Sequence, residues 1–215
     1  MAQVPTGTTF FVASAYAGAQ ATTVVTNATE AVVTVTAHGY ANLDIVEVTS
    51  GWGRLNKRVF RVKSVTANTF VLEGADTSST SFYPTGSGLG TVRKVSTFTQ
   101  ITQVLGINSS GGDPKTVTYR YLESDVEFSI NDGFAATTTS LELDADGISL
   151  AGYVALKALT DVQTDTCLRT NMKSGAVMYS PCTVALNETP NFQDGQVNRV
   201  VVAVNGIGRP VRYAS

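Results

Sequence analysis

Two runs of alternating carboxylates are the residues of this sequence best suited to a chemical role. They are Glu123, Asp125 and Glu127 in the first run, and Glu142, Asp144 and Asp146 in the second. Apolar or small residues occupy most of the positions between them. Because side chains alternate between the two faces of a strand, each run predicts a strand with one acidic face. Such a face repels phosphate groups and would not retain nucleic acid. The same pattern also fits a strand face that is kept soluble by its charges.

The second run also resembles the start of a calcium-binding loop. Gly147 follows Asp146, as the turn of such a loop requires. However, the twelfth position is Tyr153, where a bidentate carboxylate is needed, and no predicted helix precedes the loop. Cys167 and Cys182 lack the spacing of a zinc site or a redox motif, and we favour two buried free thiols over a disulfide. The sequence therefore predicts neither a metal nor a cofactor.

Few residues in the sequence suit catalysis. His38 is the only histidine, and no nucleophile elbow, phosphate-binding loop or zinc-protease motif accompanies it. We interpret it as a turn residue with a solvated ring. Trp52, the only tryptophan, is either a sugar-stacking side chain or an exposed aromatic at a subunit contact. The sequence therefore favours a protein that is not an enzyme.

The composition points to strands and away from nucleic-acid binding. Only 15% of the 215 residues are charged, below the usual value of about a quarter, and the formal net charge is −2. The densest basic pairs are Lys57-Arg58 and Arg93-Lys94, which we interpret as solvated strand edges. The start of the chain lacks a basic segment, and no run of about eighteen apolar residues occurs, so we expect neither a secretory leader nor a membrane span.

Hydrophobic alternation predicts a small β-barrel in the first half of the chain. Five short strands are expected at 31–37, 44–49, 59–65, 69–73 and 91–95, separated by turn residues. Five strands within about seventy residues are typical of a small closed module. We therefore expect a small, closed or nearly closed β-module that ends near Val95, followed by a different piece of chain.

The second half of the chain predicts further strands and one helix. Strands are expected at 97–104, 115–130, 138–145, 177–179 and 182–186, and a hairpin of 197–204 and 210–213 around Asn205-Gly206. A polar surface loop is expected at Asn108, Ser109, Ser110, Gly111, Gly112, Asp113 and Pro114. A helix is expected over 149–165, with Ser149 as N-cap and one apolar face formed by Ala151, Val154, Ala155, Ala158, Leu159 and Val162. The predicted fold is mainly β, a β-sandwich flanked by one α-helix and carrying the inserted barrel. We also expect the strand holding Val200, Val201 and Val202 to be covered on both faces.

Several stretches together resemble a known family. They are Val4-Pro5-Thr6-Gly7-Thr8-Thr9-Phe10, Ala37-His38-Gly39-Tyr40 with Asp44-Ile45-Val46, Asn68-Thr69-Phe70-Val71-Leu72-Glu73-Gly74, Ser96-Thr97-Phe98-Thr99-Gln100-Ile101-Thr102 and Tyr121-Leu122-Glu123. In this combination the chain resembles the major tail tube proteins of long-tailed, lambda-like bacteriophages, the siphophages. The resemblance extends over nearly the whole sequence, and it implies a small β-barrel inserted at 27–95 into a core formed by 1–26 and 96–215.

The resemblance implies a structural role in the virion. Subunits would form hexameric rings that stack into a tube, with their inner sheets joined around a lumen through which the genome passes into the host. The loop from Asn108 to Pro114 would become ordered on ring stacking, and the two acidic runs are candidates for the lumen wall.

Partners follow from the same resemblance. They would be further copies of the chain, a tape measure protein, a tail terminator, distal tail proteins and passing double-stranded DNA held without specific contacts. No membrane partner is expected, and assembly would take place in the host cytoplasm. The alternative is a virion decoration protein or a cell-surface binding module of β-sandwich type, which would remain a discrete monomer or trimer.

Overall fold

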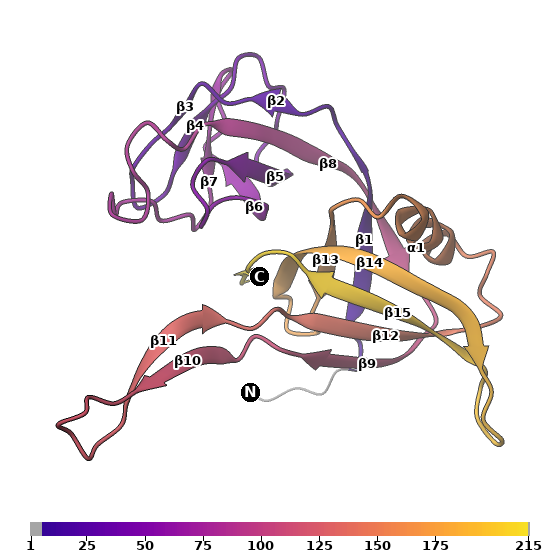
Figure 1. Cartoon of the computed structure of the whole chain (residues 1–215). Coiled ribbons are helices and arrows are strands. Elements are labelled where there is room, and N and C mark those ends of the chain that lie inside the picture. Colours follow the sequence, from indigo (N-terminus) through magenta and orange to yellow (C-terminus); the bar gives the residue numbers. More distant parts are fainter. Residues whose placement is uncertain (1–5, 215) are drawn as a thin grey trace.

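A computed structural model describes residues 6–214 of the chain (Figure 1). Residues 1–5 and Ser215 lie outside the described part, and with them Val4 and Pro5 of the stretches compared above. The described chain is mainly β with one helix, which confirms the predicted fold class. One antiparallel sheet of 14 strands and a separate two-stranded ribbon contain the strands.

The described fold has three parts, which we call the lobe, the body and the arm. The lobe contains β2 (Gln20–Ala21), β3 (Val24–Val25), β4 (Val32–Thr34), β5 (Ile45–Ser50), β6 (Arg58–Lys63), β7 (Thr69–Leu72) and the first residues of β8 (Gly90–Ile101). The body contains β1 (Thr9–Tyr16), the rest of β8, β9 (Val104–Ser110), β12 (Thr138–Asp144), α1 (Ala151–Val162), β13 (Thr166–Asn171), β14 (Val177–Asn191), β15 (Arg199–Gly206) and β16 (Val211–Tyr213). The arm contains β10 (Pro114–Tyr119) and β11 (Phe128–Phe134).

The body sheet curls around a single core. Its strands follow the order β8-β1-β13-β14-β15-β12-β9, all antiparallel. Val12 and Leu168 from β1 and β13 share one buried cluster with Leu141 and Val202 from β12 and β15. Strands at opposite ends of the sheet therefore pack their apolar sides against each other, as the two layers of a sandwich do.

Helix α1 closes one side of this core, but its start and its buried face differ from the prediction. The N-cap residue is Leu150, which makes no side-chain capping bond, so Ser149 is not the cap. The buried side chains are Tyr153 and Leu156, whereas Val154 is 53% exposed. Gly152 allows this close approach, because a Cβ there would lie 2.5 Å from the carbonyl oxygen of Gln100. Within the described residues, no helix is long and apolar enough to cross a membrane.

The lobe has a core of its own, and the five strands predicted there are confirmed. Its sheet follows the order β3-β4-β7-β6-β5-β8. Trp52, Phe60 and Phe70 are fully buried in this second cluster. Figure 1 shows the lobe as a separate mass beside the body, connected to it through β1 and β8.

Four strand predictions outside the lobe were wrong, and one of them concerns 177–179 and 182–186, which belong to a single strand, β14. Residues 91–95 and 97–101 form one strand, β8, and the chain then turns at Gln103, whose φ is +55°. Residues 115–130 form two strands and a turn. The strand β13 was not predicted. Asn205 and Gly206 lie inside β15, and β16 pairs with β14 instead of forming a hairpin with β15.

The two cysteines are buried free thiols, as predicted. Cys182 belongs to the body core, whereas Cys167 lies in a third cluster together with Ile45 and Val59 of the lobe. The thiols therefore point to opposite faces of the sheet, which prevents a disulfide between them. Burial raises the pKa of Cys182 to about 12 and raises the pKa of Cys167 as well.

The buried thiols predict a loss of stability in mild alkali. In the unfolded chain a thiol ionises near pH 8.5, whereas both folded thiols stay protonated there because their pKa values are raised. Their contribution is complete below that pH and is lost as the pH rises towards the folded pKa. Between about pH 8.5 and 9.5 the free energy of unfolding should fall by about 1 kcal/mol per thiol.

Urea unfolding of the monomer at a series of pH values measures this loss. The double variant Cys167→Ala, Cys182→Ala is the matched control, and its unfolding free energy should change less over the same range. An equal slope in both proteins would contradict the assignment of the alkaline loss to the thiols.

Candidate assembly surfaces

The first acidic run lies in a turn, not on a strand. Glu123, Asp125 and Glu127 belong to residues 120–127, which connect β10 to β11 at the tip of the arm. All three carboxylates are exposed. The expected alternation between an acidic and an apolar strand face therefore does not exist at this position, because the chain reverses direction there.

The second acidic run lies mostly where it was predicted. Glu142 and Asp144 project from one face of β12, and Leu141 and Leu143 on the opposite face are buried. Asp146 follows in the turn after the strand, where its N–H donates a hydrogen bond to Oδ1 of Asp144 at 3.0 Å. Among the described residues, no cluster of three potential metal ligands is found.

The face of β12 that carries Glu142 continues across β9, β12, β15 and β14 as a partly exposed surface of mostly small side chains, some polar and some apolar. Cross-strand registers give three rows: Gly106–Glu142–Val201–Asn187, Asn108–Ser140–Ala203–Ala185 and Ser110–Thr138–Asn205–Thr183. We call this surface the open face. Glu142 is the one charged residue in these rows, and Arg199 donates a hydrogen bond to its Oε2 at 2.7 Å.

The open face corrects two expectations. Val200 and Val202 are buried, but Val201 is only partly covered, so β15 is not covered on both faces within one chain. The open face is also nearly neutral, because Arg199 offsets the charge of Glu142. Asp144 stands beyond the rows as a further carboxylate opposite Arg199.

The predicted polar loop is the root of the arm. Asn108, Ser109 and Ser110 complete β9, and Pro114 begins β10, so only Gly111, Gly112 and Asp113 lie between strands. Gly111 has φ +81°, and a Cβ there would lie 2.0 Å from the carbonyl oxygen of Ala136. The arm can therefore leave the body at this place only because glycine occupies position 111.

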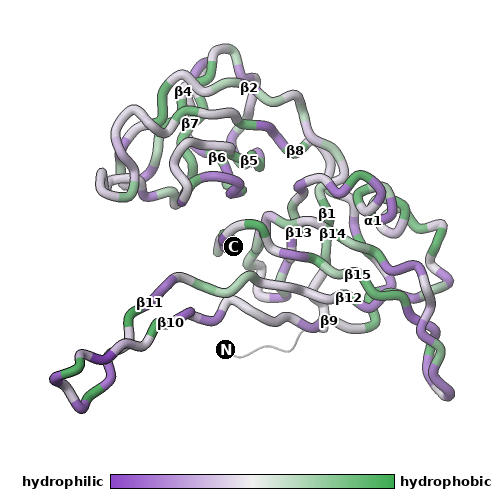
Figure 2. The backbone as a smooth tube through the Cα atoms, in the orientation of Figure 1, coloured by the Kyte–Doolittle hydropathy of each residue, from purple (hydrophilic) through white to green (hydrophobic). Residues whose placement is uncertain are grey.

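The arm is a two-stranded ribbon with one apolar face. Val117 pairs with Ile130 and Tyr119 pairs with Phe128 on this face, whereas threonine, serine and asparagine form the other. Every residue of both strands is exposed. Figure 2 shows hydrophobic and hydrophilic positions mixed along the arm, which projects away from the body. A two-stranded ribbon is marginally stable alone, so this face needs a covering surface.

Two further surfaces of the body lack a partner within the chain. β9 is the last strand of the sheet, and no described strand pairs with its outer edge, so its outward N–H and C=O groups are free to bond. Helix α1 carries an exposed apolar stripe formed by Ala151, Val154, Ala158 and Val162. This stripe includes most of the face that was predicted to be buried. The helix is thus apolar on two sides and covered on one.

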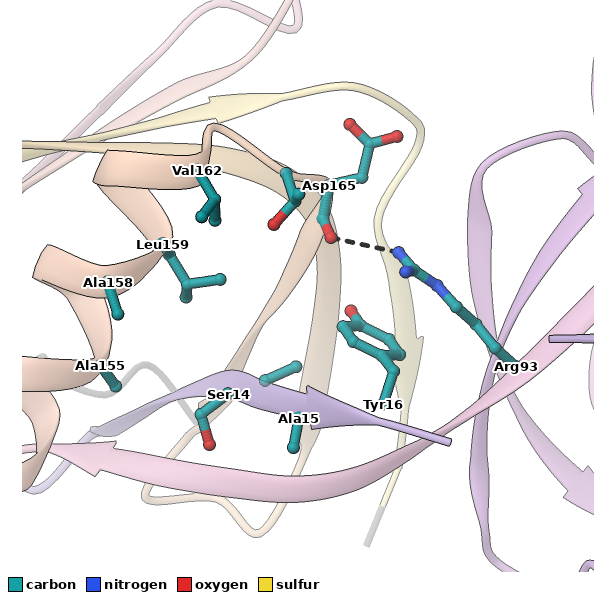
Figure 3. Close-up of a pocket in the computed structure, with 11 residues that line it drawn as sticks. Ser14, Ala15, Tyr16, Arg93, Ala155, Ala158, Leu159, Val162 and Asp165 are labelled. Carbon is teal, nitrogen blue, oxygen red and sulfur yellow. Dashed lines mark hydrogen bonds between the residues drawn. The ribbon is translucent and has the colours of Figure 1, made fainter. Parts of the chain in front are cut away.

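The lobe is fixed to the body by charged and aromatic contacts. Arg93 donates hydrogen bonds to both carboxylate oxygens of Glu47 at 2.8 and 3.0 Å, and to the carbonyl oxygen of Asp165 at 3.1 Å. Its guanidinium lies 4.0 Å from the centre of the Tyr16 ring. Lys57 forms an ion pair with the Asp165 carboxylate at 2.7 Å. Figure 3 shows Arg93, Tyr16 and Asp165 meeting at one end of a shallow cavity of about 340 Å³ beside α1.

The basic pairs are therefore not simple solvated edges. Arg93 and Lys57 form the ion pairs described above. Lys94 forms an ion pair with Asp44 at 2.7 Å. On the far side of the junction, the Tyr213 hydroxyl accepts a hydrogen bond from the Arg61 N–H at 2.9 Å and donates one to the Glu73 carbonyl oxygen. These contacts hold the lobe in one position relative to the body.

The residues considered for catalysis or sugar binding lie in the core of the lobe. His38 is buried, contrary to the expected solvated ring, and its Nδ1 accepts a hydrogen bond from the Tyr40 N–H at 3.0 Å. Trp52 is also buried, and its indole N–H donates to the Pro84 carbonyl oxygen at 2.8 Å. Neither side chain is available to a substrate or a sugar in this structure, so both act as core residues.

Comparison with known proteins gives one family. Residues 50–215 match the family described as phage tail tube protein, TTP, which is more than half of the chain. No curated protein matches. Among solved structures, a chain of the virion of a native gene transfer agent particle is similar at 14% identity and a TM-score of 0.41, covering 54% of this chain and 89% of that chain. A chain of the anti-feeding prophage cap, a tube-terminating cap, is similar at 12% identity and a TM-score of 0.37, covering 54% and 83%.

Proposed function

Because this chain belongs to the phage tail tube protein family, we propose that its copies close into hexameric rings and that these rings stack into the tube that delivers the genome to the host. The family membership makes the protein a structural component of a phage tail. The observation that carries the finer proposal is the unpaired outer edge of β9 at the end of the body sheet. Pairing this edge with a strand of the next subunit would continue the sheet around a ring.

The open face is the proposed lumen wall. The lobe packs on the face of the sheet formed by β1, β13 and the start of β14, where Ala13, Cys167 and Tyr179 contact Ile45 and Val59. Because the sheet curls around its core, the rows on β9, β12, β15 and the end of β14 lie on the other side of that core. With the lobe outside, the open face can line a channel.

The chemistry of the open face suits passing DNA. Short hydroxyl, amide and methyl groups present no cation that could hold phosphates, since Glu142 offsets Arg199. A wall without free cations makes no counterion-releasing contacts, so double-stranded DNA can move past it without specific binding. Glu142 and Asp144 would face the lumen, and Asp146 would lie at its rim. Glu123, Asp125 and Glu127, at the arm tip, do not share this face and are assigned to contacts between subunits.

The arm, the lobe and the other tail proteins also have roles in the proposed tube. The arm, whose root contains Asn108–Pro114 of the expected stacking loop, would pack on a second copy. Residues 27–95 would be an inserted barrel on the outside of the tube. Further partners would be the tape measure protein, the tail terminator and the distal tail proteins of a siphophage, with assembly in the host cytoplasm. None of these roles requires catalysis.

Electron microscopy of the purified protein tests the ring proposal. We expect hexameric rings or hollow tubes as the protein concentration rises. A monomer or trimer that never stacks at any concentration would overturn the proposal and favour a virion decoration protein or a cell-surface binding module.

A charge reversal tests the lumen wall. Asp144→Lys changes a half-buried residue at a strand end and removes one acceptor of the Asp146 N–H, so it should lower the unfolding free energy by about 1 kcal/mol. In each ring it adds a set of cations to the open face, which should attract phosphates and slow DNA ejection by about tenfold or more.

The matched control is Asp161→Lys, which makes the same change at an exposed position of α1, away from the open face. It should eject DNA at the normal rate. The measurement is the ejection rate from purified virions carrying each variant. Equal rates for both variants would reject the open face as the lumen wall.

A further inference from the structure

The arm tip carries carboxylates that form no ion pair within residues 6–214. Seven ion pairs form among the described residues, and none includes Glu123, Asp125 or Glu127. Residues 120–127 also contain Arg120, which leaves the tip with a net charge of −2 from three carboxylates and one guanidinium. Such a concentration of like charges is repulsive unless a cation is brought close to it.

The same tip ends in a completely exposed leucine. Leu122 has an exposure of 101%, the highest value among the exposed large hydrophobic residues of the described chain. Behind it, Tyr119, Tyr121 and Phe128 contact one another, with ring centroids 5.5 to 6.0 Å apart. The aromatic cluster supports the tip from below and leaves Leu122 projecting. Burial of this leucine in a cavity would remove its side chain from water, so a receiving cavity would stabilise a contact.

A matching cavity opens at the root of the arm. It has a volume of about 200 Å³, and we call it the socket. Its apolar lining residues are Leu168, Met178, Cys182, Val204 and Pro210. Its hydroxyl-bearing lining residues are Ser109, Ser110, Thr137, Thr139 and Ser180. A cavity with this lining accepts one aliphatic side chain and offers hydrogen bonds around it.

Two arginines that form no ion pair with a described carboxylate flank the socket. Arg212 is the cross-strand partner of Met178, and Arg209 precedes Pro210, so each adjoins a lining residue. Neither forms an ion pair with a described residue. The Arg209 guanidinium instead lies 4.5 Å from the centre of the Phe134 ring, and Arg212 approaches the sulfur of Met172. The socket therefore combines an apolar floor with two cations that are available to a carboxylate ligand.

The arm cannot fill the socket of its own chain. Gly111 lines the socket, and the arm leaves the body at this residue. The six residues of β10 then carry the tip about 20 Å away, at roughly 3.3 Å per residue. An occupant with the properties of the tip must therefore come from another molecule.

We propose that the arm tip of one copy docks in the socket of the next copy, with Leu122 in the cavity and Glu123, Asp125 and Glu127 facing Arg209 and Arg212. This inference rests on the proposed self-assembly and adds the pair of surfaces that meet. Each copy offers a tip at one end of the arm and a socket at the other, so the contact is heterologous and repeats from copy to copy. Repetition of such a contact generates a closed ring or a continuous filament.

Charge exchange between the two surfaces tests the proposal. The tip variant is Glu123→Lys, Asp125→Lys, Glu127→Lys, and the socket variant is Arg209→Glu, Arg212→Glu. Each variant alone should raise the concentration needed for half-assembly by at least tenfold. The chain with both sets of changes should assemble within about threefold of the unmodified protein, because the charges again oppose each other.

Asp132→Lys is the matched control on the arm. This variant also changes a carboxylate to a cation, but the change lies in strand β11 and not at the tip. It should assemble normally. Sedimentation and electron microscopy measure assembly, and circular dichroism checks that each variant folds. Failure of the combined chain to recover, or normal assembly of both single-surface variants, would overturn the docking contact.

A cross-linking experiment covers the case in which a variant fails to fold. In assembled protein that carries Cys182→Ala, Leu122→Cys combined with Ser180→Cys should give a ladder of covalent multimers with a short bis-maleimide, and Leu122→Cys alone should not, because Cys182 is the native thiol of the socket. Tubes that form but give no ladder would reject the docking contact and leave the ring proposal intact. An unmodified protein that never assembles would reject both.

Discussion

The unpaired edge of β9 is the constraint on which the account of this protein depends. Backbone N–H and C=O groups at a sheet edge are strong donors and acceptors, and an exposed flat edge pairs with other chains unless something blocks it. β9 ends the body sheet, and no strand of the described chain pairs with its outer edge; the ribbon of β10 and β11 continues from it with an uncovered apolar face. A single copy therefore leaves both backbone and side-chain surface uncovered. A second copy is the simplest molecule that covers both.

The rest of the fold keeps these surfaces in fixed positions. The curled sheet and α1 enclose one core, which holds β9 and the rest of the open face in place. Gly111 sets the direction in which the arm leaves. The lobe is held away by the contacts of Arg93 with Glu47 and Asp165, and by the Tyr213 hydroxyl. Self-assembly thus uses surfaces that the monomer already holds in place.

The lobe could be predicted from the sequence because its strands are short and alternate regularly. The body was harder, for physical reasons. β13 is covered by the core on one face and by the lobe on the other, so Thr166–Asn171 shows no alternation. The alternation of residues 121–128 continues through a turn and imitates one long strand. The turn signal at Asn205-Gly206 was overridden by pairing with the long strand β14.

The candidate surfaces were predicted in part. Alternation correctly placed Glu142 and Asp144 on the strand face opposite the buried Leu141 and Leu143. It could not identify Arg199 as the partner of Glu142, because the pair forms across two strands far apart in sequence. The socket, whose lining comes from β9, β12, β13, β14, β15 and the segment before β16, has no sequence signal at all.

Hydrogen exchange at the β9 amides tests the central claim most directly. The amide groups on the outer edge of β9 should exchange rapidly in the monomer, since no described strand pairs with them. In assembled protein they should become protected by at least about tenfold, because the next subunit would accept their hydrogen bonds. Equal exchange at this edge in monomeric and assembled protein would contradict an assembly built by joining sheets edge to edge.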